Sequence, residues 1–166
     1  MVISIGGISN AGKSKLAEKM AAYYTDKSVI VLCQDDYAKP TAEIPKIKGH
    51  TNWEIPDSID FERFYHAVTE GVQNFDHVIA EGLFVCFEKR LLELYQKSIY
   101  ISISRETFFR RKRKDLRWGK EPEWYMEHIW ASNMKYCNEL ASRTNAFQLS
   151  GEDQTDFGAV IRYLES

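Results

Sequence analysis

The chain has 166 residues, of which 44% are hydrophobic and 28% charged, and this composition is typical of one soluble globular domain with a full core. The net charge of −2 gives no overall reason to expect nucleic acid or an anionic membrane as a partner. No apolar run approaches the length of a membrane span, and "MVISI" is too short for a signal peptide. The cysteines Cys33, Cys86 and Cys137 show no C-x-x-C spacing, which indicates reduced and mostly buried thiols. We therefore expect a single cytoplasmic domain over residues 1–166.

The first predicted elements are a strand over 2–5, a glycine-rich turn and a helix over 13–24. The turn, "GISNAGKS", matches G-x-x-x-x-G-K-[ST], the pattern of a phosphate-binding P-loop. Glycines let successive backbone N–H groups face phosphate oxygens, the lysine reaches the β- and γ-phosphates, and the serine hydroxyl holds Mg²⁺. An ordinary strand–helix turn is the alternative. The predicted nucleotide-binding residues are Gly7, Asn10, Ala11, Gly12, Lys13, Ser14 and Lys15.

A second strand, 28–33, is followed directly by Asp35 and Asp36. A carboxylate at this edge of a parallel sheet could accept the proton of an attacking hydroxyl, and we assign that role to Asp35. As an alternative, both aspartates could cap the next turn. The irregular stretch 34–57 is long for a compact domain, and it begins at the sheet edge where α/β proteins bind ligands. It is therefore predicted to form a substrate wall, where Trp53 could stack on a planar ring.

A helix over 58–70, stopped by Gly71, precedes the buried strand 77–82, "HVIAEG". Glu81 lies at the end of that strand. In a P-loop protein a carboxylate in this position is suited to orient Mg²⁺ or its waters, because hard oxygen ligands match a hard cation; a solvated strand-end carboxylate is the alternative. A short helix over 88–96 follows.

Strand 98–104 leads into a basic helix over 105–117, and residues 105–120 include eight lysines and arginines. Such a cluster could be a solvated face or a nucleic-acid site. Because the P-loop already implies a phosphate-rich ligand, we favour a mobile lid over 105–125 that neutralises charge in the transition state. The arginines spaced to share one helical face are Arg110, Arg113 and Arg117, and the last two are predicted to be catalytic.

The chain ends with a helix over 122–142, a strand over 146–150 and a helix over 154–165. Strands that alternate with helices indicate a parallel sheet covered on both faces. The predicted fold class is therefore α/β, a P-loop kinase fold with a parallel sheet of about five strands, helices on both faces and an arginine-rich lid.

Five segments, taken together, resemble the nicotinamide riboside kinases, within the uridine kinase-like group of P-loop kinases. These segments are "GISNAGKS", "QDDYAKP", "NWEIPDSID", "AEGLFVC" and "HIWASNMKY". Uridine kinases usually carry an added hairpin before the strand that ends in the metal-site acid. Here "HAVTEGVQNFDHVIAEG" runs from helix to strand without room for it.

The resemblance implies roles for individual residues. ATP phosphates would lie on Gly12 and Lys13, with Mg²⁺ near Ser14 and Glu81. Asp35 would act as the base on a ribose 5′-hydroxyl, with Asp36 beside it in the substrate site. The acceptor would also be contacted by two loop residues, Trp53, where an aromatic stacks on the substrate ring, and Glu54, where the family usually has an aspartate on the ribose hydroxyls.

The sequence thus predicts a cytoplasmic kinase that uses ATP and Mg²⁺ to phosphorylate the 5′-hydroxyl of a ribonucleoside, with nicotinamide riboside as the favoured acceptor. Its partners would be ATP and a small nucleoside, without nucleic acid or membrane. The alternatives within the enzyme class are a uridine/cytidine kinase and a kinase for another small alcohol, such as pantothenate. From a different class, the chain could be a nucleotide-binding regulatory module, which would need no base aimed at an acceptor.

Overall fold

A parallel five-stranded sheet forms the centre of the protein, with the strand order β2-β5-β1-β6-β7. The computed structural model describes residues 1–117, 119–137, 145–152 and 156–166. The strands of this sheet are β1 Val2–Gly7, β2 Val29–Cys33, β5 His77–Gly82, β6 Lys97–Ser102 and β7 Phe147–Ser150. The predicted α/β class and strand number are confirmed.

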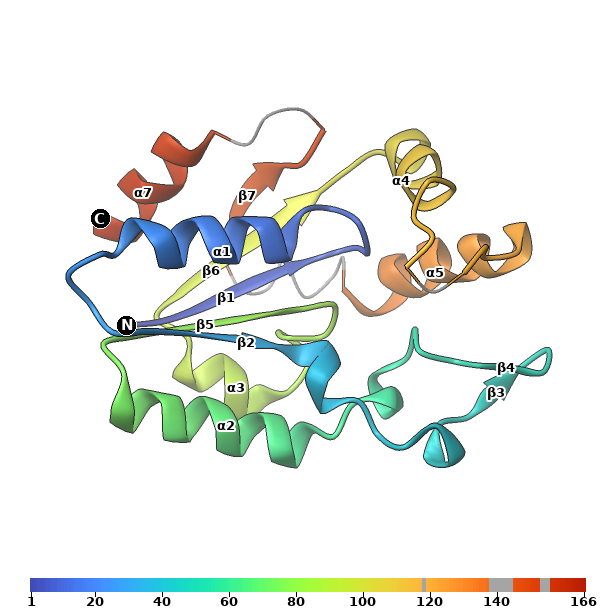
Figure 1. The fold of residues 1–166 in the computed structure, drawn as a ribbon, viewed down its shortest axis with the longest axis horizontal. Coiled ribbons are helices and arrows are strands. Elements are labelled where there is room, and N and C mark those ends of the chain that lie inside the picture. The colour runs from blue at the N-terminus through green and yellow to red at the C-terminus, as the bar shows by residue number, and fades with distance from the viewer. Residues whose placement is uncertain (118, 138–144, 153–155) are drawn as a thin grey trace.

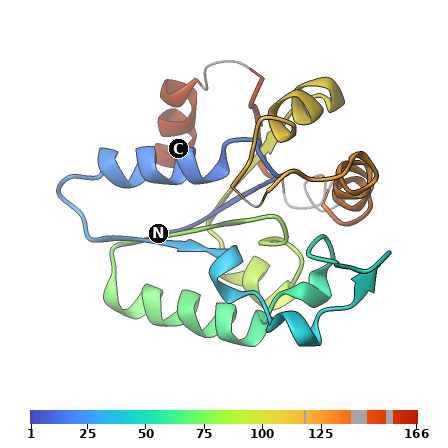
Figure 2. The same ribbon diagram turned by 45° about the vertical axis from the view of Figure 1, so that its right-hand side comes forward.

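Helices cover both faces of the sheet (Figures 1 and 2). One face carries α1 Lys13–Tyr23 and α7 Phe157–Glu165, and the other carries α2 Phe61–Asn74 and α3 Lys89–Leu94. Successive side chains of a strand point to opposite faces, so the apolar strands feed two cores. In β5, Ile79 packs in the cluster with α1 and α7, whereas Val78 and Ala80 pack in the cluster with α2. The strands are mainly apolar along their middle residues because both faces of the sheet are covered.

The remaining elements gather beyond the carboxyl ends of the strands (Figure 1). Here lie α4 Arg105–Lys112, α5 Glu123–Tyr136 and a small antiparallel hairpin of β3 Lys46–Ile47 and β4 His50–Thr51. The stretch expected to be irregular also contains short 3₁₀ turns, at Gln34–Tyr37, Thr41–Glu43 and Pro56–Ser58. The long loop is therefore an organised segment at the ligand-binding edge of the sheet.

Two predicted helix ends are wrong. α2 runs past Gly71, because this buried glycine serves packing: a Cβ there would lie 3.1 Å from Val78 Cγ2. α4 ends at Lys112 rather than at residue 117, and the Asp115 carboxylate accepts the backbone N–H of Arg117 at 3.2 Å. Such a side chain–backbone bond offers the chain a turn in place of another helical turn.

Parts of two other predicted helices lie outside the described residues, at 138–144 and 153–155. Of the three free cysteines, Cys137 is buried and the other two are partly exposed. Among the helices that the structure describes, none has the length and apolar character needed to cross a membrane.

Candidate active site

The P-loop lies between β1 and α1, and its glycines have conformations or neighbours that other residues would not tolerate. Gly12 has φ +105°, a left-handed value that residues with a side chain rarely adopt. A Cβ at Gly7 would lie 2.4 Å from the backbone oxygen of Ile101 on β6. Lys13 Nζ donates to the Ile8 carbonyl at 3.2 Å, so the lysine folds back over the turn. This is the backbone geometry that a phosphate cradle requires.

Ser14 and Glu81 meet at the start of α1. The Ser14 hydroxyl donates to Glu81 Oε1 at 2.7 Å, and Glu81 is only 2% exposed at the end of β5. A hydroxyl and a carboxylate at one point are the hard oxygen donors that Mg²⁺ prefers. Within the described residues no group of three His, Cys, Asp or Glu side chains could hold a metal ion. This pair therefore fits Mg²⁺ in the mode that relies on few protein ligands together with substrate phosphates and water.

Gln34 links the ends of β2 and β5 and so positions the neighbouring acids. Its side chain is fully buried, and Oε1 accepts the Phe84 backbone N–H at 2.7 Å. A Cβ at Gly82 would lie 2.4 Å from Gln34 Cβ, so only glycine allows the two strand ends to approach this closely. Asp35, next in the chain after Gln34, is thereby held at the same sheet edge as Glu81.

Asp35 is accessible from the cavity, but its protein surroundings still raise its pKa, mainly by desolvation. Glu81 and Asp36 raise this pKa further, whereas the cations Lys13 and Arg117 lower it. These opposing effects mean that the carboxylate faces both the P-loop lysine and an arginine of the basic segment. A carboxylate with a raised pKa is a stronger base than an ordinary exposed aspartate.

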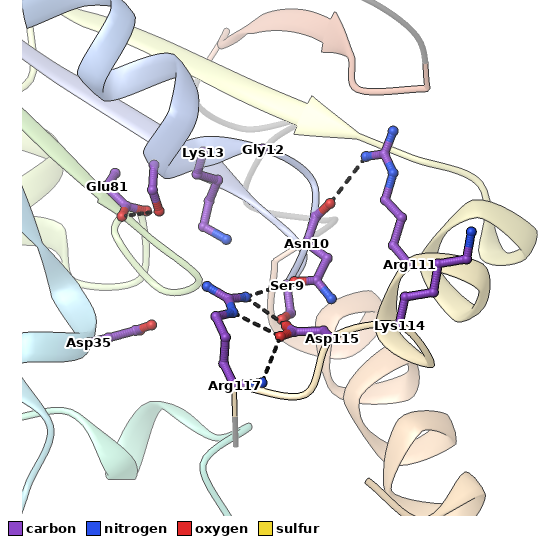
Figure 3. Close-up of a pocket in the computed structure, with 11 residues that line it drawn as sticks. Ser9, Asn10, Gly12, Lys13, Asp35, Glu81, Arg111, Lys114, Asp115 and Arg117 are labelled. Atoms are coloured by element: carbon purple, nitrogen blue, oxygen red, sulfur yellow. Dashed lines mark hydrogen bonds and ion pairs between the residues drawn. The ribbon is translucent and has the colours of Figure 1, made fainter. Parts of the chain in front are cut away.

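An open cavity of about 460 Å³ joins these features. Figure 3 shows Lys13, Asp35 and Arg117 directed into the same space, with Glu81, the partner of Ser14, at its margin. Its lining residues are Ser9, Asn10, Gly12, Lys13, Ser14, Asp35, Glu81, Arg111, Lys114, Asp115 and Arg117. The structure therefore unites the P-loop, both strand-end acids and the basic segment around one cavity.

Arg117 enters the cavity from a turn after α4. Its guanidinium forms an ion pair with Asp115, with Nη2 2.7 Å from Oδ2, and donates to Asn10 Oδ1 at 3.0 Å (Figure 3). The Arg117 side chain holds the pKa of Asp115 well below its usual range. Arg117 is thus placed beside the P-loop by a carboxylate of its own segment.

The other two arginines of the predicted helical face do not line the cavity. Arg113 forms an ion pair with Glu123 on α5, with Nε 2.9 Å from Oε1, and Arg110 donates to Thr107 at 3.0 Å. The spacing that grouped them with Arg117 assumed a helix as far as residue 117, and α4 ends earlier. In this structure Arg113 therefore links α4 to α5 and does not line the cavity, and its catalytic role stays a prediction.

Arg111, which the sequence did not single out, bridges two loops at the cavity. It donates to the Asn10 carbonyl in the P-loop at 3.1 Å and to the carbonyls of Gly151 and Glu152 after β7 at 2.6 and 2.9 Å. Nothing in the local pattern distinguished Arg111 from the neighbouring basic residues, because its partners lie far away in the chain.

The remaining predicted residues are not among those that line the cavity. These are Gly7, Ala11 and Lys15 of the P-loop region, and Asp36, Trp53 and Glu54 of the long loop. Trp53 is 42% exposed. Glu54 is half-buried, its Oε2 atom is buried without a hydrogen-bond partner, and burial raises its pKa to about 7. The charges of Lys112, Asp35 and Lys13 also act on this pKa, so Glu54 lies within electrostatic reach of these residues.

The chain is similar to proteins that are named as kinases. No protein-family profile matches the chain. It is 27% identical over 160 residues to nicotinamide riboside kinase 1 of Mus musculus, covering 86% of this chain and 81% of that protein. It is 26% identical over 147 residues to a uridine kinase of Mycoplasma genitalium, covering 72% and 69%.

Solved structures with similar folds are also kinases. A possible uridine kinase from Bacillus stearothermophilus superposes with a TM-score of 0.61 and 16% identity, covering 89% of this chain and 87% of that one. Shikimate kinase from Bacteroides thetaiotaomicron gives a TM-score of 0.64 and 16% identity, covering 99% and 94%. The chain therefore has the fold of P-loop kinases, and its predicted resemblance to nicotinamide riboside kinases is confirmed.

Proposed function

We propose that this protein transfers the γ-phosphate of ATP, bound with Mg²⁺, to the 5′-hydroxyl of a ribonucleoside, and that nicotinamide riboside is the acceptor. The observation that carries the proposal is Asp35, a carboxylate of raised pKa that shares one cavity with Lys13 of the P-loop. A protein that only binds nucleotides needs no base at that place. The similarity to proteins named nicotinamide riboside kinase supports the choice of acceptor.

The P-loop side of the cavity would hold the nucleotide. The backbone at Gly12 and the Lys13 ammonium would bind the phosphates, and Lys13 can leave the Ile8 carbonyl for a stronger, charge-assisted bond. Ser14 and Glu81 would hold Mg²⁺, which when bound neutralises charge on the phosphates. The Ser14 hydroxyl that now donates to Glu81 would then turn its oxygen toward the metal.

Asp35 would accept the proton of the acceptor hydroxyl and orient that oxygen toward the γ-phosphate. Its desolvated position moves its pKa toward the working pH, which favours proton transfer. Arg117 lies across the cavity, held by Asp115 and Asn10 (Figure 3). We assign to Arg117 the stabilisation of negative charge on the transferred group, the role that the sequence had divided between Arg113 and Arg117.

The long loop of residues 34–57, called the acceptor loop from here on, would bind the nucleoside. Trp53 offers an indole face, and Glu54 a carboxylate that would hold the ribose hydroxyls. Both features favour a ring with a fixed positive charge, as in nicotinamide riboside, over neutral uracil. α2 ends at Asn74 and β5 begins at His77, so no pyrimidine-recognition hairpin lies between them.

A panel of acceptors tests the proposal directly. The protein is incubated with ATP and Mg²⁺ and, in turn, nicotinamide riboside, uridine, cytidine or pantothenate, and both ADP and the phosphorylated product are measured. We expect acceptor-dependent ADP formation with the highest kcat/KM for nicotinamide riboside. Preference for uridine would overturn the acceptor assignment and leave a nucleoside kinase. ATP turnover that is independent of every acceptor would indicate a nucleotide-binding module instead.

A further inference from the structure

Tyr125, on the first turn of α5, forms hydrogen bonds to the backbone of the acceptor loop on either side of Asn52. Its hydroxyl donates to the Thr51 carbonyl at 3.2 Å and accepts the Trp53 backbone N–H at 3.3 Å. Tyr125 is 4% exposed, and the ring of His50 stacks on it with centroids 5.9 Å apart. Tyr125 therefore fixes the backbone from which the Trp53 side chain projects.

His128, three residues further along α5, contacts Asn52 itself. Its Nε2 lies 2.7 Å from Asn52 Oδ1, and the same oxygen accepts the Glu54 backbone N–H at 3.4 Å. An amide oxygen only accepts hydrogen bonds, so Nε2 is the protonated nitrogen. Through Asn52, His128 fixes the backbone of Glu54 just as Tyr125 fixes that of Trp53.

The backbone of Trp53 also donates its N–H to the Thr51 carbonyl at 3.2 Å and accepts the Ser58 hydroxyl at 2.9 Å, so Tyr125 and His128 add to local hydrogen bonds, whereas the two side chains have few contacts of their own. Trp53 is 42% exposed and is absent from the three hydrophobic clusters formed by the described residues. Glu54 Oε2 has no hydrogen-bond partner. A partly exposed side chain that no hydrogen bond holds depends on its backbone for its position, and small displacements of a binding group lower affinity and rate.

We propose that Tyr125 and His128 are positioning residues for the phosphoryl acceptor: they hold the acceptor loop so that Trp53 and Glu54 face the nucleoside, and neither touches the reacting atoms. This inference rests on the proposed function for the identity of the acceptor. The contacts of Tyr125 and His128 with the acceptor loop do not depend on the proposed function. Neither residue is part of the P-loop or of the cavity lining, so ATP binding should not depend on them.

Matched variants separate positioning from general stability. Tyr125→Phe removes one hydroxyl and keeps the buried ring. Tyr163→Phe is the control, because the Tyr163 hydroxyl likewise accepts one backbone N–H and donates to one carbonyl, both of Ser98, each at 3.2 Å. Losing such a pair of bonds should raise the acceptor KM by about tenfold in Tyr125→Phe, with the ATP KM unchanged. The control should leave both KM values unchanged.

His128 allows a rescue test. His128→Leu should raise the acceptor KM, whereas His128→Gln, which retains an amide N–H donor, should restore most of the wild-type value. An equal rise in the KM of ATP and of the acceptor, or a loss confined to kcat, would overturn the positioning role. The positioning role of His128 would also be overturned if His128→Gln is as stable as wild type but keeps the raised KM for the acceptor.

Amide hydrogen exchange tests the contacts without any acceptor. In the ligand-free protein, Tyr125→Phe should speed exchange of the Trp53 amide, and Tyr163→Phe should not. Unchanged exchange at Trp53 would overturn the inference even if the enzyme is confirmed as a nucleoside kinase. Faster exchange in a protein that phosphorylates no nucleoside would refute the proposed function while upholding the role of Tyr125 in holding the loop.

Discussion

Replacing Glu54 by glutamine should change how the stability of the protein depends on pH. Burial raises the pKa of Glu54 from 4.5 to about 7, against the opposing influence of Lys112, and its Oε2 has no partner. The folded protein therefore holds this proton more tightly than the unfolded chain. The resulting stabilisation is complete below about pH 4.5 and is lost as the pH rises through about 7.

The size of the effect follows from the pKa shift. Each pKa unit corresponds to roughly 1.4 kcal/mol, so ionisation of Glu54 should remove at most about 3 kcal/mol from the free energy of unfolding. Glu54→Gln stays neutral and escapes this loss. We expect the variant to match wild type near pH 4.5 and to become progressively more stable than wild type up to about pH 7.5, with a constant difference above that.

Urea denaturation of both proteins between pH 4.5 and 8.5 measures this difference. Glu43→Gln, which removes an exposed carboxylate from the same loop, serves as the control and should follow wild type throughout. Parallel pH profiles for wild type and Glu54→Gln would refute the view that Glu54 is held in a desolvated site.

Three further substitutions test the chemistry. Lys13→Ala should depress phosphorylation far more than the melting temperature, and near-normal turnover would contradict the P-loop assignment. Asp35→Asn should lower kcat by roughly 10²–10⁴-fold with nucleotide affinity little changed, as measured by ADP release and nucleotide titration; a larger loss for Asp36→Asn would identify the other carboxylate as the base. Trp53→Leu should lower kcat/KM for nicotinamide riboside by several-fold more than for uridine, because cation–π attraction contributes roughly 0.5–2 kcal/mol; equal losses would leave Trp53 without a role in discrimination.

The basic segment also forms ion pairs away from the P-loop. Lys112 is 6% exposed, with Nζ 3.6 Å from Glu121 Oε1, and Arg113 pairs with Glu123. These pairs tie α4 to the start of α5, which in turn holds the acceptor loop through Tyr125.

Local sequence patterns were sufficient to predict the P-loop turn, the covered parallel sheet and the two acids at its edge. The glycine pattern demands a turn that only glycine can form, and Gly12 indeed adopts φ +105°. Short apolar runs that alternate with helical patterns indicate a parallel sheet covered on both faces, and the five predicted strands form that sheet in the order β2-β5-β1-β6-β7. Asp35 and Glu81 were identifiable because the carboxyl ends of parallel strands meet at one edge, which is a property of the fold class.

Tertiary structure decided which residues meet at that edge. Arg111 contacts Asn10, 101 positions away, and Tyr125 contacts Trp53, 72 positions away; no local pattern encodes either pair. Arg113 satisfied the helical spacing of a site residue, yet the end of α4 and the carboxylate of Glu123 direct it elsewhere. Backbone preferences and periodicity act over a few residues and are visible in the sequence, whereas the partner of a charged side chain depends on which distant segments the packed cores bring beside it.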